Sequence, residues 1–566
     1  MSAKIYAGVI ASFSLLFAPA SWAAIKEYHL NIDQGMVNIT GKSVKRMTVN
    51  GKFIAPLLEF EEGDEAVIHV HNQLKDQDTS LHWHGLLLPG LMDGVPGFNG
   101  FKGIQPNGSF EYRFKVRQNG TYWYHAHSKG QEQDGLYGAL IIYPKGKQPV
   151  AQHEKADRDY VVMLSDFHET DSDQIMANLK KSAEYYQNQR ETVGDVWQQV
   201  KQKGLKATWQ DRSMWNQMRM LKTDLSDVTG YTFLVNGKTP QQNWTGAFSA
   251  GEKVRLRFIN ASAMSFFDVR IPNLKMTVVS ADGQPVQPVA VDEFRIGAAE
   301  TYDVIVEPKQ AHYQIEAESI DRSGFAIASL QRDTVAPPAQ IEMPKARPRA
   351  LLTMQDMGID HSTHDSMKMG NMNEMHQQQM TSQHENVKSE SVQGWANAST
   401  PTGHKALQYA DLKSLTPQPD TRPAERELVI RLGGNMERYM WTMNGKKFSD
   451  AEPLQVKYGE RIRLKFINDS MMAHPMHLHG MFMQLENGQA AIDMPNKHTV
   501  VVPPGQTVTA LLTADELGEW AIHCHLLYHM SAGMMNKLIV ANVDDSKTVN
   551  QPNATAPSEG ANHAHH

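Results

Sequence analysis

The chain has 566 residues, of which 55 are lysine or arginine and 62 are aspartate or glutamate, giving a formal net charge of −7. This balance provides no general basic surface for nucleic acid. A single cysteine excludes an intramolecular disulfide and a thiolate-rich zinc or iron–sulfur site. The unusual feature is 25 histidines and 31 methionines, because imidazole and thioether bind soft and borderline metals.

Residues 1–23 have the layout of a cleavable export signal. Lys4 precedes an apolar stretch over residues 5–18, and small residues end at Ala23. The apolar stretch is shorter than the roughly 20 residues that a membrane span needs. We therefore expect cleavage near Ala23, no membrane span in the mature chain, and an extracytoplasmic location.

The rest of the chain contains an internal repeat. The sequence GEKVRLRFINASAM from Gly251 recurs as GERIRLKFINDSMM from Gly459, and a weaker copy, GDEAVIHVHNQL, begins at Gly63. A second motif, GTYWYHAH from Gly120, aligns on GEWAIHCH from Gly518. Period-2 alternation within such repeats predicts three related β-sandwich domains, over residues 24–146, 147–343 and 406–545.

The middle copy lacks the histidines of the last one. With FAIASL (residues 325–330) aligned on WAIHCH (residues 520–525), Ser329 stands in the place of Cys524. In the other repeat the last copy has histidines where the middle copy has Phe266, Val269 and Ile271. The histidines are therefore not required for the fold.

Three segments depart from the strand pattern. Residues from about 171 to 221 are rich in Gln, Lys, Glu and Ala with helical spacing, which predicts a helical insertion in domain 2. Residues 344–405 are predicted to be a flexible linker, with seven methionines and four histidines between Met354 and His384. Residues 546–566 are predicted to be a disordered, histidine-containing tail.

Most of the chemistry is concentrated in four short clusters. They are His82-Trp83-His84, His125-Ala126-His127, His474 with His477 and His479, and His523-Cys524-His525 followed by His529 and Met534. Residues i and i+2 of a strand face the same way, so each His-x-His pair directs two imidazoles to one side. Four facing pairs would supply eight nitrogens, enough for three copper ions.

Cys524 lies between two members of a pair and therefore points to the opposite face of its strand. There it can join His474, His529 and Met534, and two imidazoles, a thiolate and a weak axial thioether make a blue-copper electron-transfer site. One His-x-His pair alone is a weak signal, but four pairs joined to the cysteine by fixed spacing are not. Zinc fits poorly, because the pattern does not give one closed tetrahedron.

These clusters resemble those of the multicopper oxidases, and the resemblance covers nearly the whole mature chain. It implies an all-β fold of three cupredoxin-like Greek-key domains and four copper ions. The implied ligands are His474, Cys524, His529 and axial Met534 for type 1 copper, His82 and His477 for type 2, His84, His125 and His525 for one type 3 copper, and His127, His479 and His523 for the other.

Finer features resemble the periplasmic copper-resistance oxidases of the CopA type. They are residues 92–97 (MDGVPG), 130–133 (GQEQ) and 439–445 (YMWTMNG), together with the methionine-rich linker. This resemblance implies a periplasmic protein. Because the signal has Lys4 and no arginine, export through a Sec-type signal is expected rather than a twin-arginine one.

The resemblance implies one-electron oxidation of a substrate at Cys524 and reduction of O₂ to water at the histidine cluster. Water formation consumes protons, and Asp93 matches an acidic position beside the type 2 copper; its other interpretation is an Asp-Gly turn residue. Many relatives also carry a glutamate before the last ligand histidine, where this chain has Leu-Leu-Tyr at residues 526–528. Glu519 is the candidate substitute.

The composition of the linker favours Cu(I) as the substrate, because thioethers prefer Cu(I) and a flexible tract would hold additional Cu(I) near the type 1 site. Two alternatives remain open. The protein is a laccase-like oxidase of phenols, or it is chiefly a copper-sequestering binding protein. The expected partners are O₂, Cu(I) or a phenol, and a periplasmic protein that donates copper, with no nucleic acid.

Overall fold

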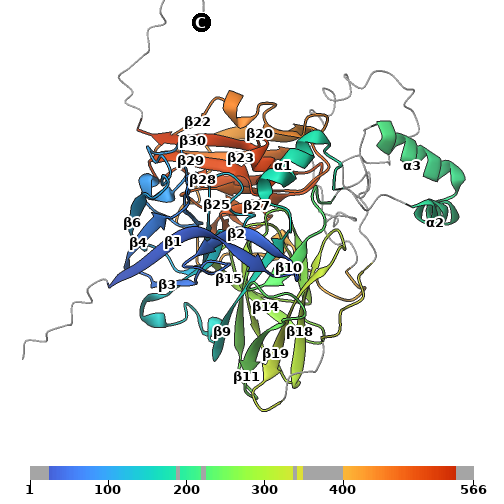
Figure 1. Cartoon of the computed structure of the whole chain (residues 1–566), viewed down its shortest axis with the longest axis horizontal. Helices are drawn as coiled ribbons and strands as arrows, with labels where there is room; N and C mark the ends of the chain where they lie inside the picture. The colour runs from blue at the N-terminus through green and yellow to red at the C-terminus, as the bar shows by residue number, and fades with distance from the viewer. Residues whose placement is uncertain (1–23, 187–191, 218–224, 336–340, 348–399, 543–566) are drawn as a thin grey trace, which may run out of the picture.

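The computed structural model describes residues 24–186, 192–217, 225–335, 341–347 and 400–542. Three β-sandwiches follow one another along the chain, in blue, in green to yellow and in orange to red (Figure 1), each built from two sheets. The all-β, three-domain prediction is confirmed. Within the described residues, no helix is long and apolar enough to cross a membrane. The export signal, most of the linker and the tail lie outside the described residues.

The first domain presents one histidine pair on one strand and the other at the end of the neighbouring strand. Its first sheet has the order β2 (Ser43–Val49), β1 (Ile25–Asn38), β4 (Glu65–Asn72) and β6 (Ser109–Lys115). The second has the order β3 (Leu58–Glu61), β8 (Tyr137–Tyr143), β7 (Gly120–His125) and β5 (His82–His84). Ala66, Ile68 and Val70 of β4 are buried in the core between the sheets, whereas His69 and His71 lie on the outer face.

The second domain carries the helical insertion. One sheet has the order β10 (Thr232–Val235), β9 (Arg158–Phe167), β12 (Val254–Asn260), β17 (Thr301–Val306), β14 (Met276–Ala281) and β15 (Gln284–Val291). The other has the order β11 (Trp244–Phe248), β19 (Phe325–Arg332), β18 (His312–Ser319), β13 (Phe267–Arg270) and β16 (Glu293–Ile296). Helices α1 (Ser172–Lys181), α2 (Val193–Lys203) and α3 (Leu205–Gln217) fall within the predicted insertion.

Helix α1 links the second domain to the third. The Asp171 side chain accepts a hydrogen bond from the Gln174 backbone N–H and so caps the first turn. Ile175 and Leu179, four residues apart on one face of the helix, are fully buried in the same apolar cluster as Cys524. The insertion therefore packs into the same apolar core as the cysteine of domain 3.

The third domain holds the remaining histidine pairs. One sheet has the order β21 (Met440–Met443), β20 (Arg426–Asn435), β23 (Arg461–Asn468), β28 (Thr507–Thr513), β25 (Met483–Leu485) and β26 (Asn496–Lys497). The other has the order β22 (Leu454–Lys457), β30 (Met535–Ala541), β29 (Gly518–Cys524), β24 (His474–Leu478) and β27 (Thr499–Val502). Helix α5 (Leu527–Ser531) follows β29 in the chain and contacts it. Across the described residues of all three domains, the short 3₁₀ helices are η1 (Gly90–Asp93), η2 (Lys145–Lys147), η3 (Gln152–Glu154), η6 (Tyr409–Asp411), η7 (Phe448–Asp450) and η8 (Ala491–Asp493).

Strand pairing corrects part of the repeat alignment. In domain 3, β29 pairs with β24, and in domain 2 the strand that pairs with the equivalent β13 is β18. The FAIASL segment lies in β19, which occupies the place of β30, so aligning Ser329 with Cys524 was wrong. In addition, Phe267 pairs with Ile296 as His474 pairs with Val502, so the alignment of Phe266 with His474 was one residue out.

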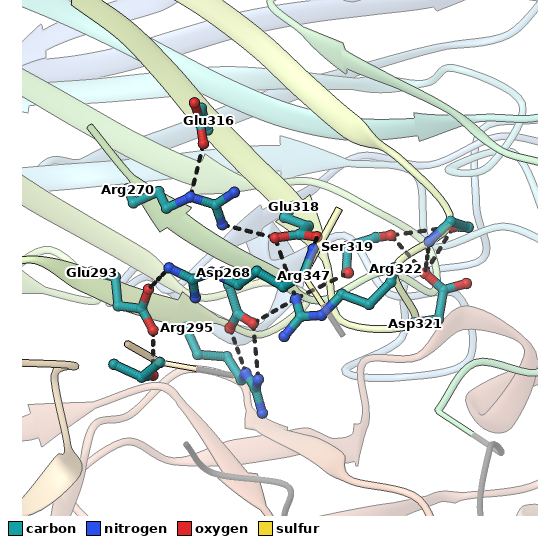
Figure 2. A network of polar contacts seen from close by, with 12 residues as sticks. Asp268, Arg270, Glu293, Arg295, Glu316, Glu318, Ser319, Asp321, Arg322 and Arg347 are labelled. Atoms are coloured by element: carbon teal, nitrogen blue, oxygen red, sulfur yellow. Dashed lines mark hydrogen bonds and ion pairs between the residues drawn. The ribbon is translucent and has the colours of Figure 1, made fainter. Parts of the chain in front are cut away.

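With the register corrected, ion pairs take the place of histidines on the middle domain. Arg270 corresponds to His477, and Glu316 and Glu318 to His523 and His525. Figure 2 shows that the Arg270 guanidinium lies between these two carboxylates, with Nε 2.8 Å from Glu316 Oε2 and Nη1 2.8 Å from Glu318 Oε2. The conclusion that this face of domain 2 carries no histidine ligands therefore holds, although the substituting residues are different.

Candidate metal centres

The four His-x-His pairs meet between domains 1 and 3. The ring of His82 stacks on that of His479 with centroids 3.8 Å apart, and His84 stacks on His477 at 3.7 Å. Further contacts across the site join Nε2 of His125 to Nε2 of His525 at 3.4 Å. His127 lies just beyond β7, with its ring centroid 5.2 Å from that of His523. The strand ends of two domains thus place all eight imidazoles around one buried space.

Several ring nitrogens of this cluster have no hydrogen-bond partner and are therefore available as metal ligands. Nε2 of His82, His127 and His477 and Nδ1 of His84 are buried without a hydrogen-bond partner. The opposite nitrogens are held: His82 Nδ1 lies 2.9 Å from the Asp93 carbonyl oxygen, and His477 Nδ1 lies 2.8 Å from that of His498. An imidazole fixed through one nitrogen and free at the other is oriented for a metal ion. These residues therefore fit copper bound by histidine alone.

Burial keeps these imidazoles in the form that binds metal. Loss of solvation lowers the pKa of His84, His477 and His523, the last to about 3. The neighbouring imidazoles lower the pKa of His84 and His477 further, because each opposes a second positive charge. The three side chains are neutral at neutral pH, with a lone pair available on one ring nitrogen.

Asp93 lies at this cluster, as expected from the sequence. It ends η1 and is buried, with Oδ2 2.9 Å from His479 Nδ1 and Oδ1 3.3 Å from His82 Nδ1. Gly94 follows with a φ of 77°, and a Cβ there would approach the Leu81 carbonyl oxygen to 1.8 Å. The turn and the contact with histidines are thus both present, because the turn brings the carboxylate between domains 1 and 3.

The second carboxylate at the cluster is Glu132 and not Glu519. Glu519 lies near the surface, where its Oε2 is 2.7 Å from Lys537 Nζ and accepts a hydrogen bond from the Asn99 N–H. Glu132 is buried, with Oε2 2.7 Å from His125 Nδ1 and Oε1 4.0 Å from His525 Nδ1. Burial raises the pKa of Glu132 well above its ordinary value. The sequence feature that could have identified Glu132 is its position in a turn, five residues after His127.

A separate group forms on the other face of β29. Cys524 Sγ lies 3.5 Å from His474 Nδ1 and 3.7 Å from His529 Nδ1, and these two nitrogens are 3.2 Å apart. Met534 is fully buried; its N–H donates to the His529 carbonyl oxygen and its own carbonyl oxygen accepts from the Cys524 N–H. Burial raises the pKa of the Cys524 thiol, so a bound cation is needed to hold it as a thiolate.

The Nε2 atoms of His474 and His529 also have hydrogen-bond partners. Ser470 Oγ lies 2.7 Å from His474 Nε2, and Asp227 Oδ2 lies 2.8 Å from His529 Nε2. Asp227 belongs to domain 2, just after the helical insertion. The Tyr439 hydroxyl donates to the same Asp227 oxygen at 2.7 Å, and Trp441 stacks on His529 with ring centroids 3.9 Å apart. No local sequence pattern marks Asp227, so its role cannot be predicted from the sequence.

Comparison with known proteins agrees with this arrangement. Three family models, each described as multicopper oxidase, match residues 31–147, 158–334 and 421–544. The chain belongs to the multicopper oxidase family. Like other multicopper oxidases it is an oxidoreductase that uses copper ions, O₂ and a reducing substrate.

Two relatives and two solved structures show how far this likeness extends. The copper resistance protein A homolog of Pseudomonas syringae pv. tomato is 47% identical, with 91% of this chain and 92% of that protein covered. Copper resistance protein A of Escherichia coli is 45% identical with the same coverage. Among solved structures, the iron-import multicopper oxidase Fet3p has a TM-score of 0.65 at 18% identity, covering 91% of this chain and 90% of that chain. A multicopper oxidase of Pseudomonas thermotolerans has a TM-score of 0.61 at 20% identity, covering 92% and 100%.

Proposed function

We propose that this multicopper oxidase acts in the periplasm in copper resistance and oxidises Cu(I) to Cu(II), with O₂ reduced to water. Relatives at 45–47% identity are named copper resistance protein A, which supports the physiological role. The proposed ligands are His474, Cys524, His529 and Met534 for type 1 copper, His82 and His477 for type 2, His84, His125 and His525 for one type 3 copper, and His127, His479 and His523 for the other. Two of these sets, His474 with Cys524 and His529, and His127 with His479 and His523, have ligand atoms within 4.8 Å of one another.

When bound, copper supplies one-electron oxidation at the Cys524 group and four-electron reduction of O₂ at the histidine cluster. The chain connects the two groups through its backbone, because His523 and His525 flank Cys524 on one strand. Residues of the cluster and of the cysteine group alternate on the two faces of β29. A single strand therefore joins the site of electron entry to the site of O₂ reduction.

The chain supplies two carboxyl groups that can hold the protons that water formation consumes. Asp93 contacts His82 and His479 from one side, and Glu132 contacts His125 from another. Glu132 is protonated more readily than an exposed glutamate because burial raises its pKa. Its protonated carboxyl would donate at the histidine cluster and be recharged from solvent between turnovers.

The single observation that favours a small cation over a phenol is the closure of the Cys524 group. His474 and His529 are fully buried, and Asp227 and Tyr439 cover the His529 Nε2 edge. An aromatic substrate needs an open pocket beside such an edge, whereas a cation is attracted by the Asp227 carboxylate. Met264, Met471 and Met472 are buried in the same cluster and offer thioethers, which prefer Cu(I).

O₂ consumption by the copper-loaded protein tests this proposal. We expect Cu(I) to support faster O₂ uptake than a phenol. Because the methionines of residues 354–384 would raise the local concentration of Cu(I), deleting them should raise KM for Cu(I) and leave KM for the phenol unchanged. A protein with the blue absorption band but no Cu(I)-dependent turnover would refute the substrate assignment.

A second variant separates oxidation from sequestration. Cys524→Ser removes the thiolate ligand and should abolish oxidase activity, while the methionines and histidines of the linker remain. If cells that carry this variant keep full copper tolerance, sequestration and not oxidation provides the resistance. Loss of tolerance together with activity supports the oxidase.

A further inference from the structure

Three histidines lie far from the cluster, on the outer face of the first sheet of domain 1. Strands β1 and β4 lie side by side (Figure 1) and pair in parallel, with His29 opposite His69. Strand β4 pairs with β6 in antiparallel fashion, with His69 opposite Glu111. Because alternate residues of a strand share a face, Glu27, His29, His69 and Glu111 all lie on this outer face. The paired histidines of the proposed function lie on other strands.

The side chains converge on one oxygen atom. His69 Nε2 is 2.9 Å from Glu27 Oε1, and His29 Nε2 is 3.3 Å from the same atom. The two imidazole rings are stacked, with centroids 4.6 Å apart and planes 11° apart, so both present Nε2 to the same side. In a four-coordinate site with bonds of about 2.0 Å, neighbouring ligand atoms are about 2.8–3.3 Å apart. The two nitrogen–oxygen distances therefore match the edges of a metal coordination polyhedron.

The surroundings of His29, His69 and Glu27 also favour the binding of a metal ion. Glu111 Oε2 lies 3.5 Å from His69 Nδ1, and the other Glu111 oxygen is held by Arg113 Nε at 2.8 Å. When a metal ion takes the place of the contact between Nε2 and Glu27, the His69 proton lies on Nδ1, where the Glu111 carboxylate can accept it and orient the ring. His29 and Glu27 have exposed fractions of 68% and 53%, so an ion from solution can reach them and His29 can turn to complete the geometry.

We propose that His29, His69 and Glu27 form a copper(II)-binding site on the outer face of domain 1. Two imidazoles and a carboxylate suit a borderline divalent cation, and such a donor set binds Cu(II) more tightly than the other first-row divalent ions. Cu(I) would be held better by thioethers, which this set of three ligands does not include. Water completes the coordination. The site stands whether or not Cu(I) is the substrate, because it takes Cu(II) from solution.

Copper uptake beyond the four catalytic ions tests the site. Wild type and His69→Ala, both loaded with the catalytic copper and full length, are dialysed against the same low concentration of Cu(II). We expect wild type to retain one more Cu(II) ion per chain. The difference in electron paramagnetic resonance spectra should show a tetragonal Cu(II) signal coupled to two nitrogens. Equal uptake by the two proteins, or a difference signal without nitrogen coupling, would overturn the proposal.

A matched control and a milder variant make the result specific. His71 is on the same strand and face, but its Nδ1 is already engaged by Ser109 Oγ at 2.9 Å and by the Gly108 carbonyl oxygen at 3.1 Å. His71→Ala should retain the additional ion, and its loss there would refute the ligand set. Glu111→Gln keeps all three ligands and should weaken Cu(II) binding about tenfold, as loss of a partner beyond the ligands does in other sites. An unchanged dissociation constant would exclude the role given to Glu111.

Discussion

Asp227 connects domain 2 to the Cys524 group, and its replacement by asparagine tests whether it controls the affinity of that group for copper. Its Oδ2 accepts two hydrogen bonds, one from His529 Nε2 at 2.8 Å and one from the Tyr439 hydroxyl at 2.7 Å. Asparagine has the same shape and can still accept through its amide oxygen, but it carries no charge. The substitution therefore removes the charge and leaves the geometry.

The magnitude follows from these two bonds. A hydrogen bond to a charged group contributes about 1.5–3 kcal/mol and one between neutral groups about 0.5–1.5 kcal/mol, so each bond loses about 1–1.5 kcal/mol. Only the bond from His529 affects a proposed copper ligand, and about 1.4 kcal/mol corresponds to a tenfold change in binding. Asp227→Asn should weaken copper binding at Cys524 about tenfold. Both bonds contribute to folding, so the free energy of unfolding of the copper-free protein should fall by about 2–3 kcal/mol.

Tyr439→Phe is the matched control, since it removes the second bond and keeps the one from His529. It should lower the free energy of unfolding by about 1.5–3 kcal/mol and leave copper affinity unchanged within a factor of about two. The assay is titration of the blue absorption band against a copper chelator, together with urea unfolding of the copper-free proteins. The reasoning fails if Asp227→Asn binds copper as wild type does, or if Tyr439→Phe weakens binding equally.

Three further predictions concern other buried groups. Glu132→Gln can still accept a hydrogen bond from His125 Nδ1, but its amide cannot release a proton. Copper content should therefore stay constant while kcat falls about 100-fold or more, as measured by O₂ uptake at saturating substrate. Thr499→Val removes a hydroxyl that lies 3.3 Å from His84 Nε2, and the copper of the histidine cluster should be lost to a chelator at about tenfold lower chelator concentration. Burial alone would raise the pKa of Asp268, but Arg295 and Arg322 outweigh it and hold the pKa at about 2, against 3.8 unfolded. This lowered pKa stabilises the protein by about 2 kcal/mol above about pH 4, and the stabilisation is lost as the pH falls towards 2; Asp268→Asn should abolish that part of the acid dependence in unfolding measurements.

The sequence predicted the parts of the site that follow from strand geometry. Spacing of i and i+2 places His477 with His479, and His523 with His525, on one face, while Cys524 faces the other way. The structure has this division, with Cys524 in the apolar core cluster and the paired histidines against domain 1. No tertiary information was needed, because the backbone of an extended strand fixes the directions of its side chains.

The alignment of the domain 2 repeat and the carboxylates of the site could not be predicted, because they depend on which strands and domains are neighbours in space. FAIASL resembles WAIHCH in composition, but only pairing with β13 identifies β18 as the counterpart of β29. Glu519 lies near Cys524 in the sequence, whereas Glu132 belongs to domain 1 and Asp227 to domain 2. The contact of Asp227 with His529, 302 positions apart, leaves no pattern in a single sequence.

The middle domain shows that ion pairs can replace the histidines without changing the fold. Arg270 with Glu316 and Glu318 stands on the face where domain 3 has His477, His523 and His525. Opposite charges satisfy one another there, whereas neutral imidazoles with free lone pairs need a metal ion to satisfy them. A buried ion pair adds little net stability over apolar residues. The stability of the β-sandwich therefore comes from its apolar core and not from the face that carries Arg270, Glu316 and Glu318. The face that carries the proposed copper ligands is therefore a surface that each domain can change independently, and the same freedom allows a different histidine pair, His29 and His69, on the outer face of domain 1.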